Sequence, residues 1–134
     1  MPLYDTSLLP TALFKQDSSL VWNAENPASA TASERIAVVA DPASPPYYSV
    51  DVIFSTNPAT YEIDIQEADY DSDADYIGSL GGALTTATLQ SDGTYRIRVD
   101  LNNPVTALFL RLYMKTAPTY MTGAPKVTAK ITRQ

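Results

Sequence analysis

The stretch TYEIDIQ, residues 60–66, decides the fold class because its side chains alternate strictly between apolar and polar. The apolar positions are Tyr61, Ile63 and Ile65, and the polar positions are Glu62, Asp64 and Gln66. A period of two places one set of side chains in a core and the other in water, which is typical of a half-buried β-strand.

The same period recurs in TYRIRVDL (94–101) and KVTAKITR (126–133). Further strand candidates are 34–40, 48–55, 75–80, 83–90 and 105–116. Polar turn signals separate these runs, and the clearest is Ser91-Asp92-Gly93, where Asp-Gly supports the positive φ angles of a hairpin. Short strands with polar turns between them predict an all-β fold, a single antiparallel β-sandwich of the jelly-roll type.

Charges on the polar faces suggest how two of the strands pair. Glu62 and Asp64 alternate along the first strand, whereas Arg96 and Arg98 alternate along the second. We therefore expect these strands to be neighbours, with cross-strand ion pairs that contribute roughly 0.2–1 kcal/mol each.

The beginning of the chain is organised differently, so we divide it into an N-terminal arm or edge strand (1–23) and a β-sandwich domain (24–134). Residues 7–22, SLLPTALFKQDSSLVW, contain apolar side chains without a clear period. This segment is either a strand laid across the core and anchored by Trp22, or an extended arm that docks on a neighbouring subunit. In the second case the contact residues are Leu8, Leu9, Leu13 and Phe14.

The longest strand candidate, 105–116, is apolar on both faces. Leu108, Leu110, Leu112 and Met114 share one face. The opposite face carries Phe109, Arg111 and Tyr113, which are candidate interface residues. Such a strand lies centrally, or beneath the arm or a neighbouring subunit.

The composition excludes several kinds of chemistry. The chain of 134 residues has no cysteine and no histidine. It therefore has no disulfide, no thiolate metal site and no Ser-His or Cys-His nucleophile pair. Without these groups we expect a protein without enzymatic activity. We also expect synthesis in a cytoplasm, because the N-terminus lacks a signal-peptide pattern and no stretch is long and apolar enough to span a membrane.

Charge is segregated along the chain. The net charge is −6, yet residues 1–95 hold fourteen acids and two bases, and residues 96–134 hold seven bases and one acid. The balance argues against nucleic-acid binding and fits charge pairing within the fold or between copies of it. Lys126 and Lys130 are candidate interface residues on the basic side.

The acidic stretch, EADYDSDADYIGS at residues 67–79, has an acid at every second position from Glu67 to Asp75. Asp69, Asp71 and Asp73 match the first ligand spacing of an EF-hand loop. However, Ala74 stands where that loop needs glycine, and Leu80 stands where it needs glutamate. Two interpretations remain, a calcium site formed by Asp69, Asp71, Asp73 and Asp75 on a β loop, or a solvated acidic loop, and the residue pattern favours the loop.

Nine tyrosines and one tryptophan also leave carbohydrate binding open, because small β-sandwiches use aromatic platforms for sugars. Alternation places Tyr61 and Tyr95 on inward faces. The tyrosines nearer to loops, and therefore candidates for contacts, are Tyr47, Tyr48, Tyr70, Tyr76 and Tyr120.

Residues 48–134 carry a further pattern, from SVDVIFSTNPATYEIDIQEADYDSDADYIGSL through TYRIRVDLNNPVTALFLRLYMKT to APKVTAKITRQ. This pattern resembles small β-sandwich virion proteins of tailed bacteriophages, of the head decoration or cement type. The resemblance implies a non-enzymatic virion protein without a cofactor, located on the capsid exterior. It would form a dimer or trimer with itself and bind the major capsid protein. The alternative is a carbohydrate- or receptor-binding module of a phage tail or fibre.

Overall fold

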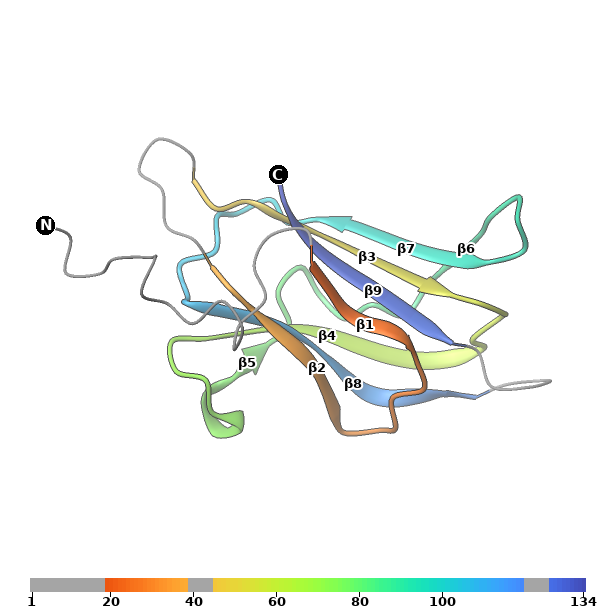
Figure 1. Cartoon of the computed structure of the whole chain (residues 1–134), viewed down its shortest axis with the longest axis horizontal. Coiled ribbons are helices and arrows are strands. Elements are labelled where there is room, and N and C mark those ends of the chain that lie inside the picture. The colour runs from red at the N-terminus through yellow and green to blue at the C-terminus, as the bar shows by residue number, and fades with distance from the viewer. Residues whose placement is uncertain (1–18, 39–44, 120–125) are drawn as a thin grey trace, which may run out of the picture.

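The computed structural model describes residues 19–38, 45–119 and 126–134. Within these residues the secondary structure consists of strands and one short 3-10 helix, η2 (Figure 1). In chain order the elements are β1 (Ser19–Glu25), β2 (Thr31–Ala37), β3 (Tyr48–Phe54), β4 (Thr60–Ala68), η2 (Asp73–Asp75), β5 (Ile77–Gly78), β6 (Thr88–Leu89), β7 (Tyr95–Asp100), β8 (Phe109–Thr119) and β9 (Val127–Arg133).

The strands form two antiparallel sheets. The five-stranded sheet has the order β1-β9-β3-β7-β6, and the four-stranded sheet has the order β2-β8-β4-β5. The pairs are nested along the chain: β4 pairs with β5, β3 with β7, β2 with β8 and β1 with β9. A long hairpin folded in this way, with its successive pairs placed alternately in two facing sheets, is the jelly roll. The predicted all-β sandwich of jelly-roll type is confirmed.

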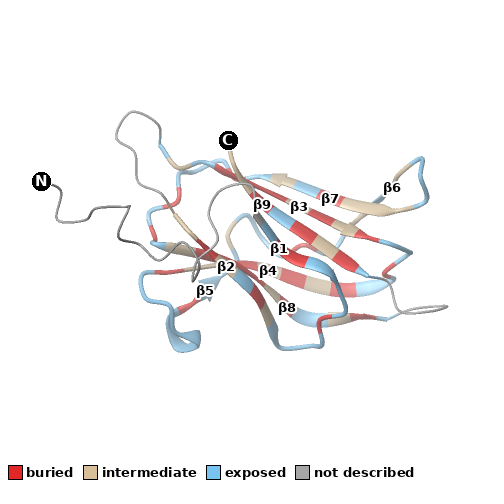
Figure 2. Cartoon of the chain, in the orientation of Figure 1, coloured by how far each residue is buried: buried red, intermediate tan, exposed pale blue. Residues whose placement is uncertain are grey.

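The core lies between the two sheets, because the period-two pattern gives each strand one apolar face. Buried and more exposed positions alternate along the strands in Figure 2. The largest fully buried side chains include Trp22, Tyr48 and Phe54 from the five-stranded sheet and Ile65 and Leu112 from the four-stranded sheet. Each side chain of this size stabilises the fold by about 1.5–3 kcal/mol relative to an exposed one.

The strand predictions are accurate where the period is clean. Predicted strands 48–55, 60–66, 94–101 and 126–133 correspond to β3, β4, β7 and β9. The candidates 75–80 and 83–90 contain only the two-residue strands β5 and β6. The Ser91-Asp92-Gly93 hairpin is confirmed, since it joins β6 to β7 and Gly93 has φ +88°.

The predicted pairing of Glu62 and Asp64 with Arg96 and Arg98 is wrong. The first two residues lie on β4 and the last two on β7, and these strands belong to different sheets. Alternation reports which side chains share a face, but the nested pairing brings together strands that are distant in the sequence. Glu62 instead pairs with Lys115 of β8, with Oε2 3.0 Å from Nζ.

The expected division after residue 23 falls within β1, which is an edge strand of the five-stranded sheet. Trp22 is 2% exposed and serves as the expected anchor. The candidate contacts Leu8, Leu9, Leu13 and Phe14 lie outside the described residues. Leu108 was expected to share one face of a strand with Leu110, but it precedes β8 and is 53% exposed, whereas Leu110 is buried.

Candidate functional site: the acidic stretch and the two outer faces

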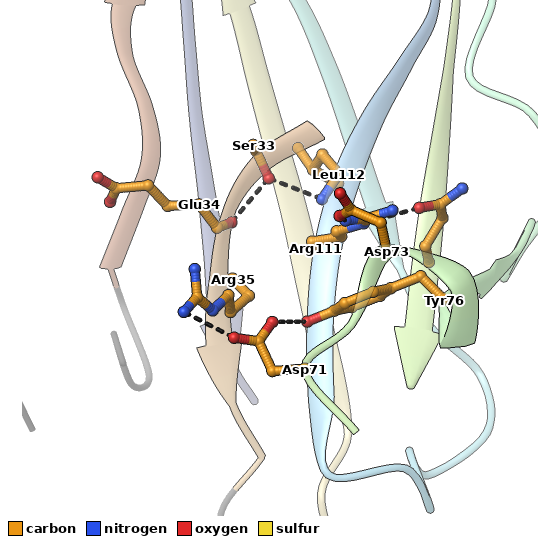
Figure 3. Close-up of polar contacts among 9 residues, drawn as sticks. Ser33, Glu34, Arg35, Asp71, Asp73, Tyr76, Arg111 and Leu112 are labelled. Atoms are coloured by element: carbon orange, nitrogen blue, oxygen red, sulfur yellow. Dashed lines mark hydrogen bonds and ion pairs between the residues drawn. The ribbon is translucent and has the colours of Figure 1, made fainter. Parts of the chain in front are cut away.

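The acidic stretch folds against the outer face of the four-stranded sheet. It begins at the end of β4, passes through η2 and ends in β5, the edge strand beside β4. Arg35 and Arg111 are register partners on the neighbouring strands β2 and β8, and both make ion pairs with this stretch (Figure 3). Two basic residues on the sheet therefore hold the acidic stretch in place.

Arg111 is the centre of this contact. Its side chain is only 8% exposed. Its Nε donates a hydrogen bond of 2.8 Å to Oε1 of Gln66, and its Nη1 donates one of 2.7 Å to Oδ1 of Asp73. The guanidinium lies 3.8 Å from the centre of the Tyr76 ring and 5.7 Å from that of Tyr113, within the range of cation–π attraction. A buried arginine with partners of all these kinds is fixed in one geometry.

Tyr76 joins this group to Arg35. The Tyr76 hydroxyl donates a hydrogen bond of 3.1 Å to Oδ1 of Asp71, whose Oδ2 lies 2.6 Å from Nη2 of Arg35. Burial raises the pKa of Tyr76 well above its usual range, and the adjacent charge of Asp71 and its hydrogen bond raise it further. Tyr76 therefore stays protonated and remains a donor. We call Arg35, Asp71, Asp73, Tyr76 and Arg111 the latch.

The geometry of the latch separates the aspartates proposed as calcium ligands. Asp71 is paired with Arg35 and Asp73 with Arg111, so both carboxylates already face cations. Asp69 and Asp75 are exposed. Across the described ranges, no group of three or more His, Cys, Asp or Glu side chains is arranged to hold a metal ion. The expected solvated loop is in fact attached to the sheet at two of its four aspartates.

The interface candidates are divided between the two outer faces. Phe109 and Tyr113 are half-buried on the outer face of the four-stranded sheet, and Arg111 between them is buried under the acidic stretch of its own chain. Arg111 was expected as an interface residue, and its side chain is only 8% exposed because a loop whose Asp73 is 38 residues away in sequence covers it. Lys126 and Lys130 are exposed and lie with the five-stranded sheet.

The outer face of the five-stranded sheet is basic at its centre. Asp51 of β3 has Arg98 of β7 and Lys130 of β9 as its two register partners. However, Asp51 binds Arg96, through Nε–Oδ1 and Nη2–Oδ2 contacts of 2.8 and 2.6 Å. The hydrogen bond raises the pKa of Arg96 above its ordinary value, and the charge of Asp51 adds to this effect. The two register neighbours of Asp51 are exposed cations, and Arg98 lies 3.6 Å from a carboxylate oxygen of Asp100.

A cleft of about 230 Å³ opens between the base of the acidic stretch and the connection from β7 to β8. Glu67, Asp100, Asn102 and Asn103 give it polar groups. Its other lining residues are Leu80, Gly81, Val99, Leu101, Pro104 and Val105. Asp100 also accepts a hydrogen bond of 2.5 Å from the Ser49 hydroxyl. The lining contains no aromatic side chain, although it offers carboxylates and amides to a polar ligand.

The aromatic residues are largely used by the core. Tyr61 is buried as expected, and Tyr95 is half-buried. Tyr48 and Tyr76 were expected to be free for contacts, but both are buried, Tyr48 in the core and Tyr76 beneath Arg111. Tyr70 is 73% exposed and Tyr47 is 36% exposed. Tyr120 lies outside the described residues.

Two residues that hold the site together were missed by sequence reasoning. Gln66 orients Arg111, and the Ser33 hydroxyl accepts a hydrogen bond of 2.8 Å from the backbone N–H of Leu112. Ser33 lies in an irregular segment of β2, where the register with β8 shifts between Ala32 and Arg35. In the sequence, Gln66 is only a polar residue within the predicted strand 60–66, and Ser33 is only a polar residue directly before the predicted strand 34–40. Many solvent-facing residues share these features.

The fold and these contacts define the class of the protein as a jelly-roll sandwich whose acidic stretch is fixed to one outer face. Comparison of the chain with family models, with curated proteins and with solved structures finds no match. Within the described ranges, no helix is long and apolar enough to cross a membrane.

Proposed function

We propose that this chain is a non-enzymatic structural protein of a tailed-bacteriophage virion, of the capsid decoration or cement type. It would lie on the capsid exterior after synthesis in the host cytoplasm. Its partners would be the major capsid protein and further copies of itself. The proposal begins from the sequence resemblance over residues 48–134, and the jelly roll is compatible with it because viral capsid domains share this fold.

The latch is the observation that carries the proposal. It holds a densely charged loop in one conformation on a sheet face, through a side chain that is only 8% exposed. A charged surface that is ordered before contact loses little entropy when a partner binds. Charge complementarity then supports rapid and specific association with a basic surface. An assembly protein needs such a surface.

The second candidate function is carbohydrate or receptor binding by a tail or fibre module, and the cleft favours it. Asn102, Asn103 and Asp100 could donate to and accept from sugar hydroxyls. The absence of aromatic side chains from the cleft lining weighs against this function, because sugar-binding sites usually offer a ring for stacking. Titration with a glycan panel, using Asn102→Ala as the control variant, distinguishes the two functions.

The decoration proposal is tested with a phage whose genome encodes the chain. Mass spectrometry of purified virions should detect the chain in many copies. Heads from a phage lacking the reading frame should release DNA at a lower temperature, and purified chain added back should restore the wild-type temperature. Virions without the chain would overturn the proposal. Gold labelling confined to tails, with glycan binding that Asn102→Ala abolishes, would support the second function instead.

A further inference from the structure

The basic row is a line of three residues across the five-stranded sheet, Lys130 on β9, Asp51 on β3 and Arg98 on β7. Neighbouring strands are about 4.8 Å apart, so the backbones of the two cations are separated by roughly 10 Å. Their neighbours in sequence, Ile97 and Ala129, face the core, so the cations project from the outer face.

The basic row has more positive charge than its own carboxylate balances. Both oxygens of Asp51 are engaged by Arg96. Arg98 reaches Asp100 only at 3.6 Å, with the two side chains 56% and 59% exposed. Within the described part of the chain, Lys130 makes no ion pair. The row therefore offers an acidic partner two exposed cations whose backbones are roughly 10 Å apart.

A surface with the opposite charge lies on the other sheet. The acidic stretch is fixed there, and its Asp69 and Asp75 are exposed and take no part in the latch. The side chain of Asp73 is 95% exposed although it binds Arg111. The two charged surfaces thus face in opposite directions from one sandwich, as the positions of β5 and β7 in Figure 1 indicate.

We propose that the basic row of one copy binds the acidic stretch of a second copy. This inference deepens the proposed function by naming the two surfaces through which copies contact each other. Because the surfaces lie on opposite faces, a two-fold dimer does not satisfy both at once. The contact is head-to-tail, and it generates a closed ring of three or more copies or an open chain. Of the expected dimer and trimer, the geometry favours the trimer.

Sedimentation velocity of the purified chain over a concentration series tests the proposal. At about 20 mM salt, where charges are screened over roughly 20 Å, the mass should rise well above the 14.5 kDa of one chain. At about 0.5 M salt, where the screening length is roughly 4 Å, it should return to that of the monomer. Arg98→Gln with Lys130→Gln should weaken self-association about tenfold, and Asp69→Asn with Asp75→Asn should do the same.

A matched control separates the contact from a general effect of net charge. Thr85→Glu with Thr86→Glu also lowers the net charge by two, but it changes an exposed segment outside both surfaces, so association should be only slightly reduced. A charge exchange gives the most specific result. Arg98→Glu/Lys130→Glu and Asp69→Lys/Asp75→Lys should each be monomeric alone and should associate when mixed.

A wild-type chain that stays monomeric at low salt overturns the inference, as does wild-type association of the Arg98→Gln/Lys130→Gln variant. Association into a two-fold dimer that ignores salt would indicate a different surface. Each of these results leaves the presence of the chain in virions unaffected. The failure of this inference is therefore distinguishable from the failure of the proposed function.

Discussion

The guanidinium of Arg111 lies 3.8 Å from the centre of the Tyr76 ring, so a residue of β8 is covered by the loop that leads into β5. The same guanidinium donates hydrogen bonds to Gln66 and Asp73. Of the two arginines that hold the acidic stretch, Arg111 is the buried one, and its removal is the most direct test of the latch.

We expect Arg111→Met to lower the free energy of unfolding by about 2–3 kcal/mol, because two charged hydrogen bonds and a cation–π contact are lost. Urea titration measures this change. Cleavage by an endoproteinase specific for aspartate should also accelerate at residues 69–75. The matched control is Arg98→Met, which removes an exposed arginine and should change stability by less than about 0.5 kcal/mol. Equal effects of the two substitutions would contradict the role assigned to the latch.

Tyr61→Phe should leave the stability unchanged or raise it slightly. The Tyr61 hydroxyl is buried without a hydrogen-bond partner among the described residues, and its ring packs against Phe54 with the centroids 4.8 Å apart. The substitution keeps the ring and removes an unsatisfied polar group, so we expect a change between 0 and about +1 kcal/mol in urea titration. By contrast, Tyr61→Ala should cost about 3–5 kcal/mol through the cavity it leaves. A loss above about 1 kcal/mol for Tyr61→Phe would show that the hydroxyl is satisfied.

Alkaline pH should destabilise the protein through the same residue. Burial raises the pKa of Tyr61 from 10.0 to about 12. In the unfolded chain the phenol ionises near pH 10, whereas in the folded chain it keeps its proton. The resulting stability is fully present below pH 10 and is lost as the pH rises through 12, by up to about 1.4 kcal/mol per pH unit. Melting temperatures between pH 9 and 12 should therefore fall less steeply for Tyr61→Phe than for the wild type, and parallel curves would exclude this explanation.

Ser33→Ala should destabilise the four-stranded sheet. The hydroxyl accepts a hydrogen bond from the backbone N–H of Leu112 and donates one of 2.7 Å to the carbonyl of Glu34. Its removal leaves a buried N–H without an acceptor, at a cost of about 1–3 kcal/mol. Ser29 makes the same type of bond to the N–H of Ala117 at an exposed position, so Ser29→Ala should cost less than about 0.5 kcal/mol. Thermal unfolding of both variants gives the comparison, and a neutral Ser33→Ala would refute it.

Calcium should have little effect on stability. Arginine side chains already neutralise Asp71 and Asp73, so an added ion gains little from the acidic stretch. We expect the melting temperature with millimolar calcium and with EDTA to agree within about 1 °C, since a ligand stabilises only in proportion to its occupancy of the folded state. An increase of several degrees in calcium would show that the aspartates rearrange to bind it.

Local sequence patterns predict the strands of this fold but not the partners of their side chains. Alternation identified β4, β7 and β9 because each has one face in the core. It could not predict that Arg96 binds Asp51, because that contact depends on which strands become neighbours in the nested order. Alternation placed Arg111 on the opposite face of its strand from Leu110 and Leu112. Its burial arises from the acidic stretch, which no periodicity within β8 can report.

The nested order also determines when the fold can form during synthesis. β9 lies between β1 and β3, although it is the last of the described strands to be made. Until residues 127–133 leave the ribosome, β1 has no partner in its sheet and one edge of β3 stays open. Trp22 therefore stays exposed until a strand about a hundred residues later in the sequence has been synthesised. During this time the open strand edges promote aggregation. We expect the sandwich to close only after residues 127–133 have left the ribosome, and the nascent chain to depend on chaperones until then.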